Sequence, residues 1–400
     1  MPPSAATTPP RARRQHRHWR VPPGLLHDPA APETLEGERI LAEYPDDRGV
    51  LLWQSYRDGL LWAGTRPEKR RGLFQGESAE HWRKLLGTAR LDATMLRALQ
   101  ALHAGLRAGR DAGAAVARAA LSLALGAVRD EAGATAIAFA QLASILEPAA
   151  AAPAVTVGGI ALGFGRTAVA ETWLRRAIGL ARRGRDWAAY GRALIALAGL
   201  RERTGQPAAA QVELRKALRL ARRRSLPETR TRALHGLLRI AIRDGDYAAA
   251  EQYARGARRG YGHEHPELGS LELDVAELAL RLGDRARAAV LLRKALPSRE
   301  SAGDQVRGLI MLVRAAADRP EVEEAWHHAA ELIADTYGSS PDAARLLLEL
   351  ARASAEIHEE RHADMAAARA LACATQLGCA ALAEEVSAFL ARPRLARATD

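Results

Sequence analysis

The chain has 400 residues, of which 48% are hydrophobic and only 4% are aromatic. Its 58 basic and 47 acidic residues give a net charge of +11, which suits an anionic partner. Only four basic residues are Lys, so the arginine bias of a GC-rich coding genome explains the same charge. The two cysteines provide no disulfide framework, and no 18-residue apolar stretch predicts a transmembrane helix.

Residues 1–32 form a basic, proline-rich segment that we predict to be disordered. The segment from Arg11 to Arg20 carries five arginines around Trp19, a pattern that can hold RNA by charge and stacking. No apolar run follows these charges, so neither a Sec nor a Tat signal is expected. The sequence therefore predicts a cytoplasmic protein with nucleic-acid binding through this tail as one open alternative.

Residues 33–150 are predicted to form an N-terminal helical region, because apolar residues recur there at helical spacing. Four large aromatic side chains gather in it, namely Trp53, Trp62, Phe74 and Trp82. They suit either a docking surface or a core, and large aromatics in helices are more often core.

From residue 151 to 392 the chain repeats itself. Aligned on Gly165, Gly205, Gly245 and Gly283, each unit has an apolar residue eight positions before the glycine. Small or apolar residues follow at plus five, nine and twelve, as in Ala250, Ala254 and Ala257. The separations are 40, 40 and 38 residues. Weaker copies are expected to turn at Asp318 and near His362, and residues 393–400 form a C-terminal tail.

This spacing predicts stacked helix hairpins. Glycine at the turn adopts the left-handed conformation that other residues resist, and small residues in the second helix allow close approach of neighbouring helices. A single hairpin cannot bury its own apolar face, so successive hairpins must cover one another.

The turns "GQPAAA" from Gly205, "GDYAAA" from Gly245 and "GDRARAA" from Gly283 resemble the tetratricopeptide repeat. The resemblance covers about 151–335 well and 341–391 loosely, although the family's standard unit has 34 residues. Longer units look like those of bacterial signalling and regulatory proteins. The resemblance implies an all-α, right-handed solenoid that binds other proteins.

In that family the first helix of each unit lines a concave groove, with ligand-facing positions at minus 13, 10, 6, 3 and 2 from the turn glycine. Carried over to this chain, these offsets select many basic side chains, which implies a groove that binds an acidic peptide bidentately. Arginines that merely coat the solenoid are the alternative. The implied groove residues are Arg192, Arg203, Arg232, His235, Arg239, Arg243 and Arg281.

Two motifs suggest chemistry. His358, Glu359 and His362 match the zinc-binding H-E-x-x-H spacing, but Glu360 and Arg361 between them favour a charged, solvated helix end. "VGGIALGFGRT", from Val157 to Thr167, has the glycine spacing of a phosphate loop without its lysine. Close helix packing explains its glycines equally well.

These features together predict a non-enzymatic interaction module, an adaptor, scaffold or sensor, without a cofactor. Its partner is expected to be a protein or an acidic peptide bound in the arginine-lined groove. The alternatives are RNA binding through the tail, a zinc metallohydrolase at the HEERH motif, and a purely structural oligomer.

Overall fold

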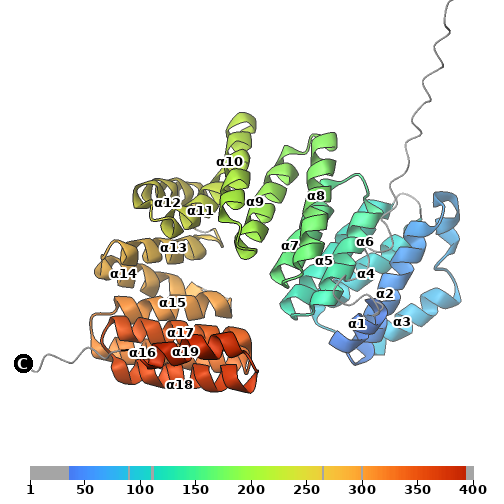
Figure 1. The fold of residues 1–400 in the computed structure, drawn as a ribbon. Coiled ribbons are helices and arrows are strands. Elements are labelled where there is room, and N and C mark those ends of the chain that lie inside the picture. Colours follow the sequence, from blue (N-terminus) through green and yellow to red (C-terminus); the bar gives the residue numbers. More distant parts are fainter. Residues whose placement is uncertain (1–35, 89–90, 110–111, 264, 299–300, 393–400) are drawn as a thin grey trace, which may run out of the picture. The chain divides into compact units, whose positions relative to one another are not determined.

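The computed structural model describes residues 36–88, 91–109, 112–263, 265–298 and 301–392. Within these ranges every regular element is a helix (Figure 1). No described helix is long and apolar enough to span a bilayer. The chain divides after Leu200 into two compact units, 1–200 and 201–400. The sequence-based boundary at residue 150 therefore lies inside the first unit.

The first unit consists of helices that pack mainly on their neighbours in the chain. Its elements are α1 (Glu36–Glu43), α2 (Asp47–Gly64), the 3₁₀ helix η2 (Pro67–Gly72), α3 (Glu77–Thr88), α4 (Ala93–Ala108), α5 (Gly113–Arg129), α6 (Gly133–Leu146), α7 (Ala151–Gly163), α8 (Thr167–Gly184) and most of α9 (Trp187–Arg203). Both α1 and α2 pack on α6.

The helix α1 is attached to α6 by one of its side chains, which caps the N-terminus of α6. The Glu43 carboxylate of α1 accepts hydrogen bonds from the Ala134 and Thr135 backbone N–H groups, at 2.7 and 2.8 Å. It thereby satisfies free donors at the start of α6. As expected for a core, Trp62, Phe74 and Trp82 are buried; Trp53 is partly buried against them.

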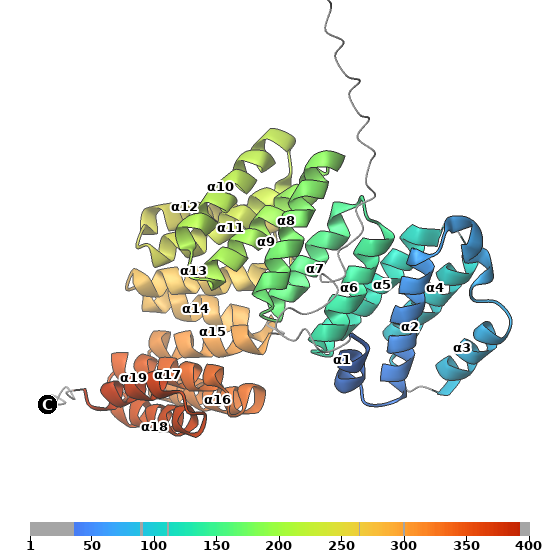
Figure 2. The ribbon, with the colours of Figure 1, turned by 45° about the vertical axis from the view of Figure 1, so that its right-hand side comes forward.

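The second unit continues as helix pairs in which each helix packs on the next (Figures 1 and 2). Its helices are α10 (Pro207–Arg224), α11 (Pro227–Arg243), α12 (Tyr247–Tyr261), α13 (Leu268–Arg281), α14 (Arg285–Ala295), η4 (Leu296–Ser298), α15 (Ala302–Ala315), α16 (Arg319–Tyr337), α17 (Pro341–Glu356), α18 (Glu360–Gln376) and α19 (Ala380–Leu390). In each pair we call the helix before the turn the first helix and the one after it the second.

The four predicted glycine turns are confirmed. Gly165, Gly205, Gly245 and Gly283 have φ angles of +72°, +70°, +76° and +80°. The residues at the predicted offsets from these turns are all buried, as they must be where helices meet. They are Val157, Ala170, Leu174 and Ala177; Leu197, Ala210, Leu214 and Ala217; Leu237, Ala250, Ala254 and Ala257; and Val275, Ala288, Leu292 and Ala295.

The same register already exists before residue 151. Glu131, between α5 and α6, has a φ angle of +58° and lies 34 residues before Gly165. At its corresponding offsets, Leu123, Ala136, Ala140 and Ala143 are buried. The pair α5–α6 thus has the repeat pattern, and its turn residue is not a glycine, which hid it from the sequence comparison.

The two weaker turns are displaced from their predicted positions. Asp318 is the N-cap of α16, just as Asp246 is the N-cap of α12. Asp246 follows the turn residue Gly245 by one position, so the turn before α16 is at position 317 and the predicted turn at Asp318 is one residue too late. The prediction near His362 is wrong by four residues, because the left-handed turn residue is His358, with φ of +61°. The side chains that are buried in the corrected registers are Val322, Trp326 and Ala329, and Ala363, Ala367 and Ala370.

Candidate functional site

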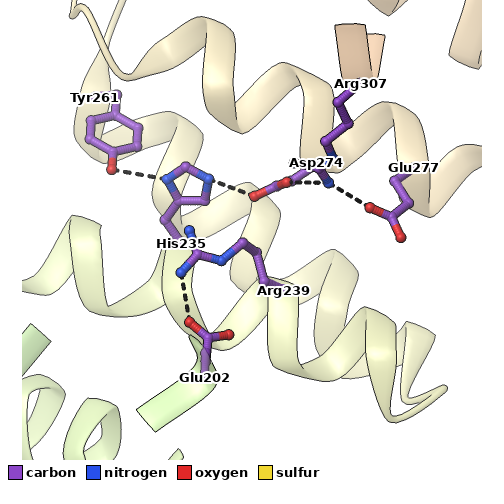
Figure 3. Close-up of polar contacts among 7 residues, drawn as sticks. All are labelled: Glu202, His235, Arg239, Tyr261, Asp274, Glu277 and Arg307. Carbon is purple, nitrogen blue, oxygen red and sulfur yellow. Dashed lines mark hydrogen bonds and ion pairs between the residues drawn. The ribbon is translucent and has the colours of Figure 1, made fainter. Parts of the chain in front are cut away.

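Seven polar side chains, six from first helices and Tyr261 from the second helix α12, meet in the second unit (Figure 3). We call them the polar cluster. They come from the last turn of α9 and from α11, α12, α13 and α15, so residues more than a hundred positions apart are brought together. The members are Glu202, His235, Arg239, Tyr261, Asp274, Glu277 and Arg307.

The centre of the cluster is a buried pair. Asp274 and His235 are 1% and 5% exposed, and the His235 Nε2 atom lies 2.9 Å from Asp274 Oδ2. The other ring nitrogen, Nδ1, lies 3.1 Å from the Tyr261 hydroxyl. In neutral His235, Nε2–H then donates to the carboxylate and Nδ1 accepts from Tyr261. Both ring nitrogens are occupied, so the pair orients its neighbours and offers no base to a substrate.

Arg307 connects this buried pair to the next repeat. Its Nη2 atom on α15 lies 2.8 Å from Asp274 Oδ1 and 2.5 Å from the Glu277 carboxylate, both on α13. Burial alone would raise the pKa of Asp274, but the His235 hydrogen bond and the Arg307 charge lower it. Asp274 is therefore a charged group inside the protein, compensated from two sides.

Arg239 extends the cluster toward the preceding repeat. Its Nη2 atom lies 2.8 Å from Glu202 Oε2, and its side chain remains 44% exposed. Burial would lower the pKa of Arg239, but Glu202 and Asp274 raise it. The Arg307 side chain is similarly open, at 39% exposed. Two oriented guanidinium groups thus reach solvent on either side of the buried pair.

The predicted groove arginines do not form an unopposed positive surface. Four of them lie near a carboxylate, at distances from 2.8 to 3.6 Å; these are Arg232 with Glu228, Arg239 with Glu202, Arg243 with Asp244, and Arg281 with Glu277. Arg192 is half-buried on the part of α9 in the first unit, and Arg203 is exposed in the last turn of that helix. His235, expected to face a ligand, is buried beneath the surface instead.

Sequence reasoning missed part of the cluster although signals for it existed. The offsets that select Arg239 also select Glu202 and Glu277, and their acidic character predicts pairing with the arginines. Arg307 lies ten residues before position 317, the corrected turn position, just as His235 lies ten residues before Gly245. The one-residue error at Asp318 therefore concealed it. Nothing in the offsets indicates Asp274 or Tyr261.

The HEERH residues do not share one helical face. His358 is in the turn and Glu359 is the N-cap of α18, whereas His362 lies within that helix. His362 is buried against Trp326, with ring centroids 4.9 Å apart, so its expected place in a solvated helix end is wrong. No three His, Cys, Asp or Glu side chains in the described part of the chain are grouped to hold a metal ion.

The glycines of the phosphate-loop-like segment include one that is needed for packing. A β-carbon on Gly158 would lie 2.6 Å from Leu174, so glycine lets α7 and α8 approach closely. The arginines from Arg11 to Arg20, on which the RNA alternative depends, lie outside the described residues.

Solved structures with a similar fold include two bacterial proteins. One is the apo form of the quorum sensor NprR from B. thuringiensis, with a TM-score of 0.51 and 10% identity, covering 80% of this chain and 97% of that chain. Another is aspartyl phosphate phosphatase F from Bacillus subtilis, with a TM-score of 0.52 and 15% identity, covering 84% and 93%. No family model and no curated protein matches the sequence. At these identities the likeness concerns the fold.

Proposed function

Because the chain has the fold of tetratricopeptide-like helical repeats, we propose that it is a non-enzymatic protein-interaction module, an adaptor or sensor. Its second unit binds an extended, carboxylate-bearing segment of a partner protein along the first helices α11, α13 and α15. The fold alone does not specify this function, so the proposal depends on the polar cluster.

The observation that carries the proposal is the orientation of Arg239 and Arg307 around Asp274. Each guanidinium is held by a carboxylate of the chain yet remains open to solvent on its outer side. Glu202 and Glu277 are exposed enough, at 19% and 28%, to be replaced by carboxylates of a partner. A partner would then find its binding groups already oriented, which lowers the entropic cost of association.

The chemistry of this exchange favours an acidic segment over a neutral one. Charge-assisted hydrogen bonds to arginine are directional and can be bidentate. A neutral peptide would leave the Glu202 and Glu277 pairs intact and gain no such bond. The carboxylates of an acidic peptide replace the Glu202 and Glu277 carboxylates on the two arginines, and the released glutamates become hydrated.

Affinity capture from a lysate of the source cells tests the proposal. The wild-type chain is compared with an Arg239→Glu, Arg243→Glu variant and with an Arg215→Glu, Arg219→Glu control. The control changes the net charge equally, but its two residues lie on α10 outside the polar cluster. Circular dichroism confirms that both variants are folded.

We expect wild type and control to retain the same discrete protein and the Arg239→Glu, Arg243→Glu variant to lose it, about tenfold or more by quantitative mass spectrometry. A partner retained equally by all three proteins would show that the first-helix surface is not its binding site. Recovery of RNA alone would favour the nucleic-acid alternative.

A further inference from the structure

A second basic site lies away from the polar cluster, between the second helices α10 and α12 and the start of α11. A pocket of about 360 Å³ opens there. We call it the arginine pocket. Its polar lining residues are Arg222, Arg230, Gln252, Tyr253, Arg255 and Arg259. None of the described residues that line it is acidic.

The guanidinium groups in this pocket lack the compensation seen in the polar cluster. Within the described part of the chain, the side chains of Arg222, Arg230 and Arg259 have no ion pair or hydrogen bond, and all three residues are exposed. Arg255 has only Glu251 at 3.5 Å, one turn earlier on its own helix. Four like charges that share a small pocket without carboxylates repel one another, and an anion relieves that repulsion.

The surrounding helices add to the positive potential. Between Pro207 and Tyr261 there are thirteen basic and five acidic residues, an excess of eight in a chain whose total excess is eleven. The helices that form the arginine pocket therefore carry an excess of positive charge, and a field of this kind attracts anions from a distance.

We propose that the arginine pocket binds the dianionic phosphoryl group of a phosphate monoester. Planar guanidinium groups donate pairs of parallel hydrogen bonds to phosphate oxygens, and several around one group match a double negative charge. The Tyr253 hydroxyl and the Gln252 amide supply further donors. The pocket is larger than a phosphoryl group, so it leaves room for the attached chain. That chain is a phosphorylated protein segment or a small ester.

This site is independent of the proposed function, because it lies on different helix faces and shares no residue with the polar cluster. Titration calorimetry of the full chain tests it, with free O-phosphoserine and with a phosphoserine-containing peptide as probes. The unphosphorylated peptide is the ligand control. The pocket variants are Arg230→Gln, Arg259→Gln and, as a second pair, Arg222→Gln, Arg255→Gln. The protein control is Arg215→Gln, Arg219→Gln, which removes the same charge from α10 outside the pocket.

We expect saturable binding that is about tenfold weaker in either pocket variant and within about twofold of wild type in the control. Tighter binding of the peptide than of free phosphoserine identifies a protein segment as the source, and equal binding identifies a small ester. The proposal is overturned if neither probe binds below about 10 mM, or if the control loses as much affinity as the pocket variants.

Discussion

Asp274 is a buried carboxylate that is stabilised from two neighbouring first helices, by a hydrogen bond to His235 on α11 and by the charge of Arg307 on α15. Sequence offsets could not indicate it, because an acid in a first helix usually faces solvent. What buries Asp274 is the packing of three repeats, and this packing is known only from the structure. By contrast, the acidic partners Glu202 and Glu277 stand at positions that the offsets do select.

Removing the charge of Asp274 is expected to destabilise the second unit strongly. Asp274→Asn leaves Arg307 without its buried counter-charge, which we expect to cost about 3 kcal/mol of unfolding free energy. Glu277→Gln, which also contacts Arg307 but is 28% exposed, should cost about 1 kcal/mol or less. Urea denaturation followed by circular dichroism measures both. Equal effects of the two substitutions would mean that Asp274 does not hold a buried charge.

His103 predicts a dependence of stability on pH. It is 6% exposed, and burial together with the nearby Arg107 charge lowers its pKa to about 4. Between its ordinary pKa of about 6.5 and this value the unfolded chain binds the proton and the folded chain does not. The contribution of His103 to the free energy of unfolding is therefore fully present above pH 6.5, and it falls by roughly 3 kcal/mol as the pH drops to 4.

The His103 ring packs on Trp82, with ring centroids 3.6 Å apart. The test is a comparison of urea midpoints at several pH values for wild type and His103→Phe, which keeps an aromatic ring at this position. The variant should lose most of the slope between pH 6.5 and 4, whatever its absolute stability. His362, whose pKa burial also lowers, stays in both proteins and leaves a common residual slope. An unchanged slope in His103→Phe would assign the pH dependence to other groups.

At the scale of helices, the turn glycines made most of the repeat array predictable. Four hairpins follow from glycine at the turn and small residues at fixed offsets, and the structure confirms each of them. The pairs whose turn residue is Glu131 or His358 were missed or misplaced. Those residues adopt the same left-handed backbone without being glycine, so the composition of the turn does not reveal them.

The two uses of glycine can be separated by substitution. Gly245 has φ of +76° with open space around a β-carbon, so Gly245→Ala should destabilise by about 1 kcal/mol through backbone strain alone. Gly159 lies within α7, is exposed and also has open space, so Gly159→Ala should stabilise by about 0.5 kcal/mol. Shifts in denaturation midpoint give both signs. A neutral Gly245→Ala would indicate that the turn tolerates a side chain.

At the scale of the whole molecule, the sequence predicts an all-α repeat protein but not how its charges are distributed. Arginine counting suggested one positive groove on the first helices. In the structure most of the predicted arginines there are paired with carboxylates, while Arg222, Arg230 and Arg259 gather around the pocket between α10, α12 and the start of α11. Which arginines pair with carboxylates depends on which repeats are neighbours. Predicting these pairs requires the repeats to be aligned to within one residue, and the weaker repeats could not be aligned so accurately from the sequence.

The partner-binding surface on the first helices is tested most directly by hydrogen–deuterium exchange of the full chain, alone and saturated with the captured partner. We expect additional protection in α11, α13 and α15, centred on Arg239 and Arg307, and its loss in the Arg239→Glu, Arg243→Glu variant. Protection confined to other helices, or protection that survives this charge reversal, would contradict a partner-binding surface on the first helices.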